Sequence, residues 1–366
     1  MSERIFLSPP FVGDEERRLV SRAFDSNYIA PCGPQVDEFE RRLAALSGRK
    51  YAVAVSSGTA ALDLVMDFYG VDSTWTVFAP TLTFIATVGP AFHRGARLEF
   101  VDSDASGNID CDLLDLALEK SSSLRRMIIS VDLYGRTANY AQIAEIARKH
   151  DAIFVSDSAE AVGARSPLGP AGIAGEASIY SFNGNKIVTT SGGGAILTDD
   201  PKLAEAVKNR SQQAREPFLW YEHKRVGYNY RLSNLLAAVG LAQLDRLPAI
   251  LEKRAATARY YRELGLDLLP PVEGENHWLN VMLCRNQDER DRLIDAFAAE
   301  NIEVRPVWKP LHLQPIFKDV KMHGGGVAAE LFARGLCLPS GTGLSDGDLR
   351  HIAATVRQAI SSTARK

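Results

Sequence analysis

The lysine at position 186 has the sequence setting of a nucleophile. The segment SFNGN at residues 181–185 precedes Lys186, and the small residues TTSGGG follow at 189–194. A lysine in a turn between two apolar strands can reach into a cleft, where partial desolvation favours the uncharged amine that attacks carbonyl groups. Most lysines are solvated surface residues, so Lys186 becomes a candidate only together with other signals.

A carboxylate at a strand end is the second signal. Asp157 closely follows the apolar run AIFV at residues 152–155 and so falls at the carboxyl end of an expected central strand. Ligands of open α/β sheets bind outside those strand ends. A carboxylate there can pair with a protonated pyridine nitrogen and keep the ring an electron sink. Taken alone, a loop or helix-cap aspartate is the commoner explanation.

A possible phosphate turn is the third signal. The segment SSGTAA at residues 56–61 stands where an expected strand ends and an apolar-periodic helix begins. Helix starts offer unpaired amide donors and a positive dipole end, and glycine lets the backbone approach an anion closely. Serine and threonine also serve as simple helix N-caps, so this segment is weak by itself.

These three signals require an α/β sheet to bring them together. From residue 51 to residue 200, apolar runs rich in β-branched residues alternate with amphipathic segments, which is typical of a mainly parallel sheet with crossover helices. The expected strands are residues 51–55, 76–79, 98–101, 127–131, 153–156, 177–182 and 195–198. Helices are expected between most of them, notably at 110–119 and 140–150.

The remainder of the chain predicts a connecting helix and a smaller unit. Residues 232–263 predict one or two long helices with a break at Pro248, because proline lacks a backbone donor and clashes inside a helix. Beyond residue 271, short strands mix with helices such as 288–300, which predicts an α+β domain. Residues 324–326 (GGG) are expected to be a flexible loop. We expect an N-terminal segment near the active site (1–12), a large cofactor-binding domain (13–245) and a small domain (246–366).

Bulk composition narrows the class of protein. The 366 residues are 46% hydrophobic and 24% charged, as in average soluble globular proteins, and the formal charge of −3 gives no broad reason for binding nucleic acid or membrane. No secretory signal or transmembrane run is visible, and a cytoplasmic location is expected. Neither a disulfide framework nor a metal cluster is expected, because the cysteines are scattered at Cys32, Cys111, Cys284 and Cys337.

The order of the three signals resembles fold-type I pyridoxal phosphate enzymes, and more closely the sugar aminotransferases of the DegT/DnrJ/EryC1/StrS family. The resemblance runs through essentially the whole chain. The segments that carry it are YIAPCGP (28–34), SGT (57–59), PTLTF (80–84), DSAEA (157–161), SFNGNK (181–186), GYNYRLSN (227–234) and PLHLQP (310–315). Three stretches, residues 5–10, 181–194 and 212–234, are closest to UDP-4-amino-4,6-dideoxy-N-acetylglucosamine transaminases.

The resemblance implies a role for each matching residue. Lys186 would hold pyridoxal 5′-phosphate as a Schiff base and act as catalytic acid and base, with Asp157 on the pyridine nitrogen. The cofactor-binding residues would be Ser57, Gly58, Thr59, Ala60, Phe84, Asp157, Glu160, Ser181, Asn183, Lys186 and Asn229. Asn229 would reach the cofactor phosphate of a neighbouring subunit, which implies a homodimer with shared active sites. Pro31, Tyr230, Arg231 and His312 would bind substrate.

Some of these positions carry other interpretations. Glu160 departs from the histidine or glutamine of many relatives, and a carboxylate there would repel a phenolate unless one of the two is protonated. Phe84 could be a plain core aromatic, and His312 could cap a loop. Arg231 could brace a subunit contact through salt bridges.

The implied reaction is amino transfer to a ketosugar. L-Glutamate would leave its amino group on the cofactor, giving pyridoxamine 5′-phosphate, and a UDP-linked 2-acetamido-2,6-dideoxy-4-ketohexose would take it at carbon 4. The alternatives are a GDP-4-keto-6-deoxymannose aminotransferase of the perosamine type, a dehydratase, and a non-catalytic regulatory relative. Dehydratases of this family carry histidine in place of Lys186. A nucleotide oxidoreductase is set aside because the first strand-to-helix unit lacks a Gly-x-Gly-x-x-Gly turn.

Overall fold

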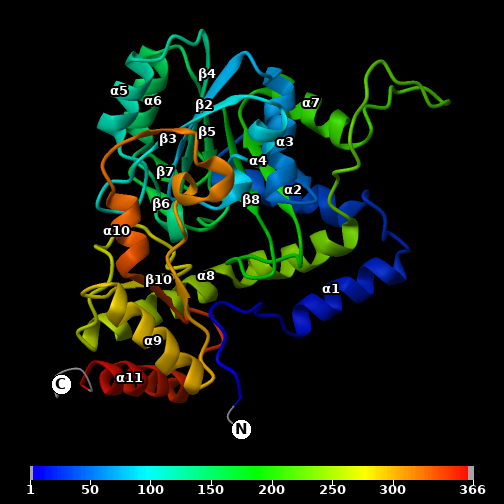
Figure 1. Ribbon diagram of the computed structural model, residues 1–366. Helices are drawn as coiled ribbons and strands as arrows, with labels where there is room; N and C mark the ends of the chain where they lie inside the picture. The colour runs from blue at the N-terminus through cyan, green and yellow to red at the C-terminus, as the bar shows by residue number, and fades with distance from the viewer. Residues whose placement is uncertain (1–2, 362–366) are drawn as a thin grey trace.

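The chain folds into a larger part built on one sheet and a smaller part beneath it (Figure 1). A computed structural model describes residues 3–361. The elements of the larger part before the connecting helix are α1 (Asp14–Asp25), α2 (Pro34–Ser47), β1 (Tyr51–Val55), α3 (Gly58–Tyr69), β2 (Trp75–Pro80), η1 (Ile85–Thr87), α4 (Gly89–His93), β3 (Arg97–Val101), α5 (Cys111–Glu119), β4 (Arg125–Val131), η2 (Leu133–Gly135), α6 (Tyr140–Lys149), β5 (Ile153–Asp157), β6 (Arg165–Ser166), β7 (Gly169–Pro170), β8 (Ala177–Ser181), β9 (Gly194–Thr198) and α7 (Pro201–Ser211).

The main sheet confirms the predicted fold class. Its eight strands run in the order β1-β9-β8-β5-β4-β2-β3-β12, where β12 is Lys321–His323. β9 is antiparallel to both of its neighbours, and every other pair is parallel. All seven predicted strands are present, and the predicted strand 177–182 ends one residue earlier, at Ser181. The carboxyl ends of β4, β5 and β8 therefore meet at one edge of the sheet.

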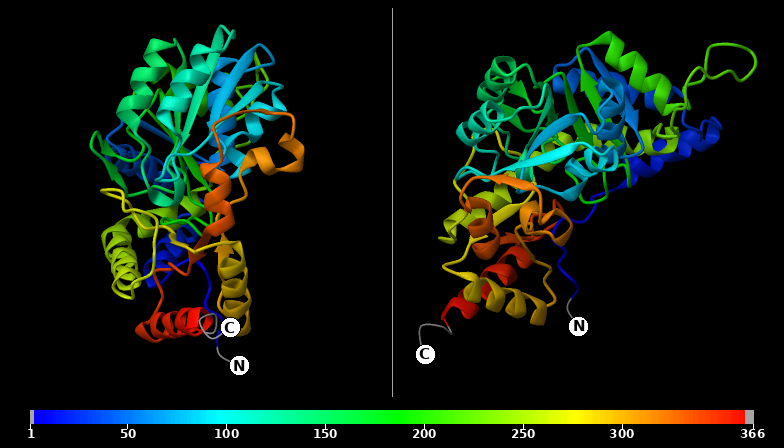
Figure 2. Two further views of the ribbon diagram at one scale, coloured as in Figure 1. Left: turned by 60° about the vertical axis from the view of Figure 1, so that its left-hand side comes forward. Right: turned by 45° about the horizontal axis from the view of Figure 1, so that its top comes forward.

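Helices cover both faces of this sheet (Figure 2). Side chains alternate across a strand, so Val53 and Val55 of β1 pack on the face with α3, whereas Ala52 and Ala54 pack on the opposite face. α4 and α7 join α3 on the first face, and α2, α5 and α6 lie on the second. Buried apolar side chains on both faces explain the near-continuous apolar runs of the strands.

The helix predicted to break at Pro248 is continuous, so that prediction is wrong. α8 runs from Asn234 to Glu263 with Pro248 inside it. Its buried positions include Leu244 and Leu247 before the proline and Ile250 after it. Burying apolar side chains in both halves, against α1 and α2 among others, offsets the roughly 3 kcal/mol that an internal proline costs. Within residues 3–361, α8 alone has the length and composition of a membrane span, and 56% of its apolar window is buried, as in a core helix.

The smaller part has the expected α+β composition. Its three-stranded antiparallel sheet has the order β10-β13-β11, and Phe297, Leu336 and Ile352 lie in the core between this sheet and its helices. The elements are β10 (Asn280–Leu283), α9 (Gln287–Ala299), β11 (Arg305–Pro306), η3 (Leu311–Leu313), η4 (Pro315–Phe317), α10 (Val327–Arg334), β13 (Gly335–Leu338) and α11 (Asp346–Ser361).

Two elements tie the parts together. The boundary expected between residues 245 and 246 lies inside α8, and β12 from the C-terminal half pairs with β3 of the main sheet. We therefore propose α8 as a connection shared by both parts.

The glycines at 324–326, expected to be a flexible loop, form a loop whose last residue, Gly326, is the N-cap of α10. The carboxylate of Asp102 accepts backbone N–H groups from Gly326, Val327 and Ala328 at the start of α10. Gly324 and Gly326 have φ values of 124° and 125°, which other residues rarely adopt. The acidic partner lies more than two hundred residues earlier in the chain, so local sequence did not reveal the cap.

Gly194 brings β9 against the start of α3. A Cβ atom at this position would lie 2.5 Å from the backbone nitrogen of Gly58 and 2.5 Å from the carbonyl carbon of Ser57. Backbone atoms cannot rotate aside as side chains can, so only glycine permits this contact.

We predict that Gly194→Ala lowers the free energy of unfolding by about 1–3 kcal/mol, because the strand must move away from the helix start. Urea denaturation measures this loss. Gly89→Ala is the matched control, since a Cβ there meets no atom within 4 Å. Equal stability of the two variants would contradict the close approach.

Candidate active site

A cavity of about 320 Å³ opens where β5 and β8 end and α3 begins. All of the predicted cofactor-binding residues except Ala60 and Asn229 line this cavity. Its walls are Ser56, Ser57, Gly58, Thr59, Leu62, Thr83, Phe84, Ala86, Thr87, Val131, Asp157, Ala159, Glu160, Ser181, Asn183, Asn185, Lys186, Gly192, Gly193, Trp278 and Trp308. The three sequence signals therefore meet at one place.

Lys186 brings its amine to a carboxylate and an aromatic ring. It lies in the turn between β8 and β9, and its Nζ is 3.5 Å from Oε1 of Glu160. On another side, Nζ lies 4.0 Å from the centroid of the Trp278 ring. The amine is thus held inside the cavity rather than in open solvent.

Asp157 presents a buried carboxylate at the end of β5. Its Oδ2 accepts a hydrogen bond from the Thr87 hydroxyl at 2.8 Å, and its Oδ1 accepts the N–H of Ala159 at 3.2 Å. Burial raises the pKa of this carboxyl above its ordinary value, although these hydrogen bonds and Lys186 oppose the shift. A cation placed against Asp157 would compensate its lost hydration.

Glu160 is a second buried carboxylate, beside the lysine. Its Oε2 accepts the backbone N–H of Tyr134 at 2.7 Å. Tyr134 has a φ of 55°, a left-handed conformation that is uncommon for a bulky residue and that accompanies this contact. Burial raises the pKa of Glu160 from 4.5 to about 7, against the opposing effect of Lys186. Glu160 can therefore hold or release a proton near neutral pH.

The start of α3 forms an anion cradle. The Ser57 hydroxyl accepts the N–H of Ala60 at 3.0 Å, and the first two residues of the helix, Gly58 and Thr59, line the cavity. A Cβ atom at Gly58 would lie 3.2 Å from the Ser181 Cβ, so glycine lets the serine stand beside the helix start. Amides, a hydroxyl and the helix dipole suit a phosphate.

The cavity residues fit pyridoxal phosphate. The helix start and Ser181 would hold its phosphate, Asp157 its ring nitrogen, and Lys186 its aldehyde. Phe84 is 55% exposed and its ring lies 5.5 Å from that of Trp308, so its face is available to a planar ring. When bound, the cofactor supplies an aldehyde that captures amines and a ring that withdraws electrons from the attached carbon.

The other predicted residues lie outside this cavity. Ala60 is buried in the first turn of α3, and Asn229 is exposed, with its backbone bridged to Gln212. Pro31 is exposed, and the Tyr230 ring stacks on Tyr228 at 4.8 Å.

His312 and Arg231 each have a partner within this chain. Nδ1 of His312 lies 2.7 Å from the Thr81 hydroxyl. Arg231, which was expected to bind substrate, has a buried guanidinium that pairs with Glu40 and donates to the Ala54 carbonyl. This contact joins α2 to β1, and we propose that Arg231 has a structural role.

Several cavity residues were not predicted. Thr87 orients Asp157, and Trp278 and Trp308 come from beyond α8, far from the three signals in sequence. For Thr87 a signal existed, since Thr83 and Thr87 are four residues apart and their hydroxyls lie 2.8 Å apart. No local pattern marks the two tryptophans, because only the packing of the smaller part brings them here.

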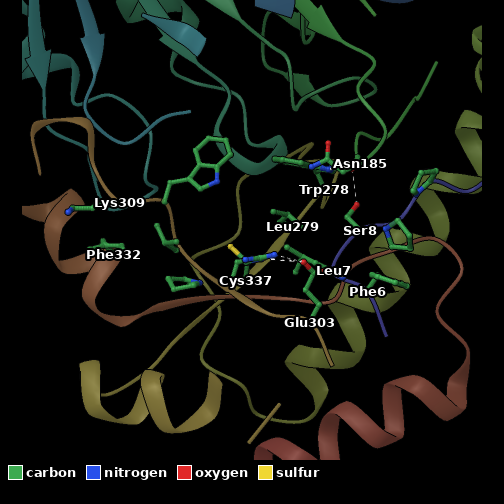
Figure 3. A pocket seen from close by; sticks show the side chains of 16 residues that line it. Phe6, Leu7, Ser8, Asn185, Trp278, Leu279, Glu303, Lys309, Phe332 and Cys337 are labelled. Carbon is green, nitrogen blue, oxygen red and sulfur yellow. Dashed lines mark hydrogen bonds and ion pairs between the residues drawn. The ribbon is translucent and has the colours of Figure 1, made fainter. Parts of the chain in front are cut away.

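A larger cleft of about 810 Å³ adjoins the cavity (Figure 3). Asn185, Trp278 and Trp308 line both spaces. The cleft lies between the N-terminal segment, residues 6–10, and the smaller part. Lys309 brings a positive charge to it, and Arg305 lines it in an ion pair with Glu303. A substrate too large for the cavity could extend into this cleft.

Comparison with known proteins supports this assignment. The family model described as DegT/DnrJ/EryC1/StrS aminotransferase family matches residues 10–357. EpsN of Bacillus subtilis (strain 168), a provisionally assigned pyridoxal phosphate-dependent aminotransferase, is 38% identical over 363 residues, covering 95% of this chain and 94% of EpsN.

Two other relatives act on different nucleotide sugars. The GDP-perosamine synthase of Escherichia coli O157:H7 is 32% identical over 358 residues, covering 96% of this chain and 97% of the relative. A UDP-4-amino-4,6-dideoxy-N-acetyl-beta-L-altrosamine transaminase of Campylobacter jejuni (serotype O:2) is 36% identical over 305 residues, covering 79% of this chain and 81% of the relative.

A solved structure shares the whole fold. The provisionally assigned sugar aminotransferase Spr1654 of Streptococcus pneumoniae, in its PMP form, superposes with a TM-score of 0.91 at 25% identity and covers 100% of both chains.

We predict that Glu160 makes the stability of the cofactor-free protein depend on pH. The pKa of Glu160 is 4.5 in the unfolded chain and about 7 in the folded chain. The contribution of Glu160 to the free energy of unfolding is therefore fully present below pH 4.5 and is lost as the pH rises through 7. The contribution is at most about 3 kcal/mol. Glu160→Gln should remove it, as measured by urea unfolding between pH 4.5 and 8.

Glu145→Gln on the exposed face of α6 is the control and should keep the wild-type pH dependence. If the free energy of unfolding of Glu160→Gln depended on pH as that of the wild type does, Glu160 would not be the group responsible.

Proposed function

This chain belongs to the DegT/DnrJ/EryC1/StrS aminotransferase family, and we propose that it moves the amino group of L-glutamate to carbon 4 of a nucleotide-linked 4-keto-6-deoxy sugar. It is a pyridoxal phosphate-dependent sugar aminotransferase of fold type I. One observation carries the proposal: the Lys186 amine shares a cavity with the buried Asp157 carboxylate and an anion cradle at α3. Transamination needs all three, and a dehydratase of this family would lack the lysine.

The side chains divide the chemical work. The Lys186 amine, when free, removes a proton from the donor α-carbon and returns it on the cofactor side, acting as base and then as acid. The Asp157 carboxylate favours a protonated ring nitrogen, which makes that proton easier to remove. Glu160 lies 3.5 Å from Nζ and can keep the amine oriented between these transfers.

For the acceptor we propose a UDP-linked 2-acetamido-2,6-dideoxy-4-ketohexose. The transaminase of Campylobacter jejuni, whose name specifies a UDP-linked 4-amino sugar, supports this choice. The adjoining cleft would receive the nucleotide, since Lys309 offers positive charge for a diphosphate, whereas Arg305 is already paired with Glu303. The second candidate is a GDP-linked 4-ketohexose, which the perosamine synthases among the relatives support.

We also propose a homodimer with shared sites. Asn229 and Tyr230, expected in the site by resemblance, lie outside the cavity of their own chain, at the base of the segment between α7 and α8. This segment projects from the body in Figure 1 and in the right-hand view of Figure 2. Its tip, between the bridged residues Arg215 and His223, exposes Leu219, Trp220 and Tyr221. A projecting apolar tip is suited to a second copy of the chain. We propose a cytoplasmic location, which the four free cysteines support.

We predict at least tenfold higher kcat/KM with the UDP-linked acetamido ketosugar than with the GDP-linked ketosugar, at equal L-glutamate. Formation of the sugar amine, measured by mass spectrometry, checks this. A preference for the GDP substrate would overturn the uridine assignment and leave the aminotransferase assignment intact. No amine from any nucleotide-linked ketosugar would favour a non-catalytic relative.

We predict that mixing inactive Lys186→Ala chains with inactive Asn229→Ala chains restores about one quarter of wild-type activity, because half of the dimers are hybrids with one intact site. Lys186→Ala mixed with Asp157→Asn is the control. This mixture should restore no activity. Each site takes Lys186 and Asp157 from one and the same chain, so every site in the hybrid dimers lacks one of them. No recovery in verified Lys186→Ala and Asn229→Ala hybrids would show that each chain builds its site alone.

A further inference from the structure

The Lys186 amine lies on the face of a tryptophan from beyond α8. Its Nζ is 4.0 Å from the centroid of the Trp278 ring, and the ring is buried. An indole face attracts a cation, and the attraction is stronger where water is excluded. With Glu160 at 3.5 Å, the amine lies between a carboxylate and an aromatic face.

The same tryptophan fixes the backbone just before the lysine. The carbonyl oxygen of Asn185 accepts two hydrogen bonds, from Nε1 of Trp278 at 2.7 Å and from the Ser8 hydroxyl at 2.9 Å. Figure 3 shows Ser8 directed toward Asn185 beside Trp278. Two donors from segments distant in sequence thus bind the carbonyl group of the peptide bond between Asn185 and Lys186.

A buried arginine forms hydrogen bonds with both Trp278 and Ser8, the two residues that donate to Asn185. Arg254 of α8 donates from Nη1 to the Trp278 carbonyl at 2.8 Å and from Nη2 to the Ser8 hydroxyl at 3.2 Å. Its Nε donates to the Thr342 hydroxyl at 3.3 Å. Within residues 3–361 no carboxylate forms an ion pair with Arg254, and burial lowers its pKa to about 9. A buried guanidinium without a counter-charge depends on these neutral acceptors, so their positions are tightly constrained.

A third contact joins the tryptophan to the strand-end loop. Asn276 accepts the Trp278 N–H at 2.9 Å and donates to the Glu160 carbonyl at 2.8 Å. Trp278 is therefore fixed at its backbone N–H, its carbonyl and its indole nitrogen. A ring fixed in this way can hold the flexible Lys186 side chain in one position.

We propose that Trp278 is a positioning residue whose indole face holds the Lys186 nitrogen in place, both when it is joined to the cofactor and when it is free, and that Arg254 and Ser8 keep this indole in position. The proposal rests on the transamination proposed above, in which Lys186 must act from one place in both halves of the cycle. A lysine side chain has many rotamers. Holding its nitrogen against a fixed ring lowers the conformational entropy that would otherwise be lost at each proton transfer. A positively charged nitrogen joined to the cofactor at the same place would be attracted by the same face.

The test compares Trp278→Leu and Trp278→Phe with wild type, as holoenzymes. The first readout is the pH midpoint of the visible absorbance change of the bound cofactor, measured without substrates. We expect Trp278→Leu to lower this midpoint by about one pH unit, and Trp278→Phe, which keeps a weaker aromatic face, to lower it by less. Trp75→Phe, a buried tryptophan at the start of β2, is the control and should not change it.

The second readout is steady-state kinetics. Trp278→Leu should lower kcat at least tenfold and change KM for donor and acceptor by less than about threefold, because the indole face acts on the amine and not on substrate binding. Arg254→Met should change both readouts in the same direction by a smaller amount.

An unchanged midpoint and kcat in a folded, cofactor-loaded Trp278→Leu would overturn the proposal. If that variant does not fold, Trp278→Phe decides by the same criteria. The midpoint is measured without an acceptor, so a wrong sugar assignment would leave this result unaffected.

Discussion

Two carboxylates and one amine share a cavity in which each of these side chains is largely buried, and the surrounding structure depends on keeping these groups there. Each group loses hydration, which is costly unless other polar groups replace the water. The Thr87 hydroxyl supports Asp157, the Tyr134 N–H supports Glu160, and an aromatic face with Glu160 supports Lys186. Parallel strands make this arrangement possible, because β5 and β8 end at the same edge and deliver their following residues to one place.

The sequence predicted what depends on local pattern. Apolar runs located all seven strands, and the order of a Ser-Gly-Thr turn, Asp157 and Lys186 located the cavity. The errors arose where distant contacts override local preference. Pro248 was expected to break the helix, but buried side chains on both sides of it hold α8 together. Residues 324–326 form a loop, as expected, and only the structure shows that Asp102 accepts the N–H of Gly326 at its end. Trp278 had no local signal, because its position depends on how the smaller part packs.

Two arginines show why residue type alone does not assign a role. Arg231 follows the tyrosine of a family segment, yet its guanidinium is buried against Glu40 and does not line the cavity. Arg254 lies in a helix with no motif around it, yet it contacts the backbone of a residue that touches the reactive amine. Burial and the identity of the hydrogen-bond acceptors distinguish the two, and both are properties of the folded chain.

The continuous α8 has a mechanical consequence. Thirty residues of helix span about 45 Å and belong to the cores of both parts, and β12 fastens the C-terminal half to the edge of the main sheet. Two attachments of this kind resist hinge bending, since either rotation or sliding would break packed contacts along the helix or hydrogen bonds in the sheet. We therefore expect short surface segments to control access to the site. The two parts of the chain should move together as one rigid body during turnover.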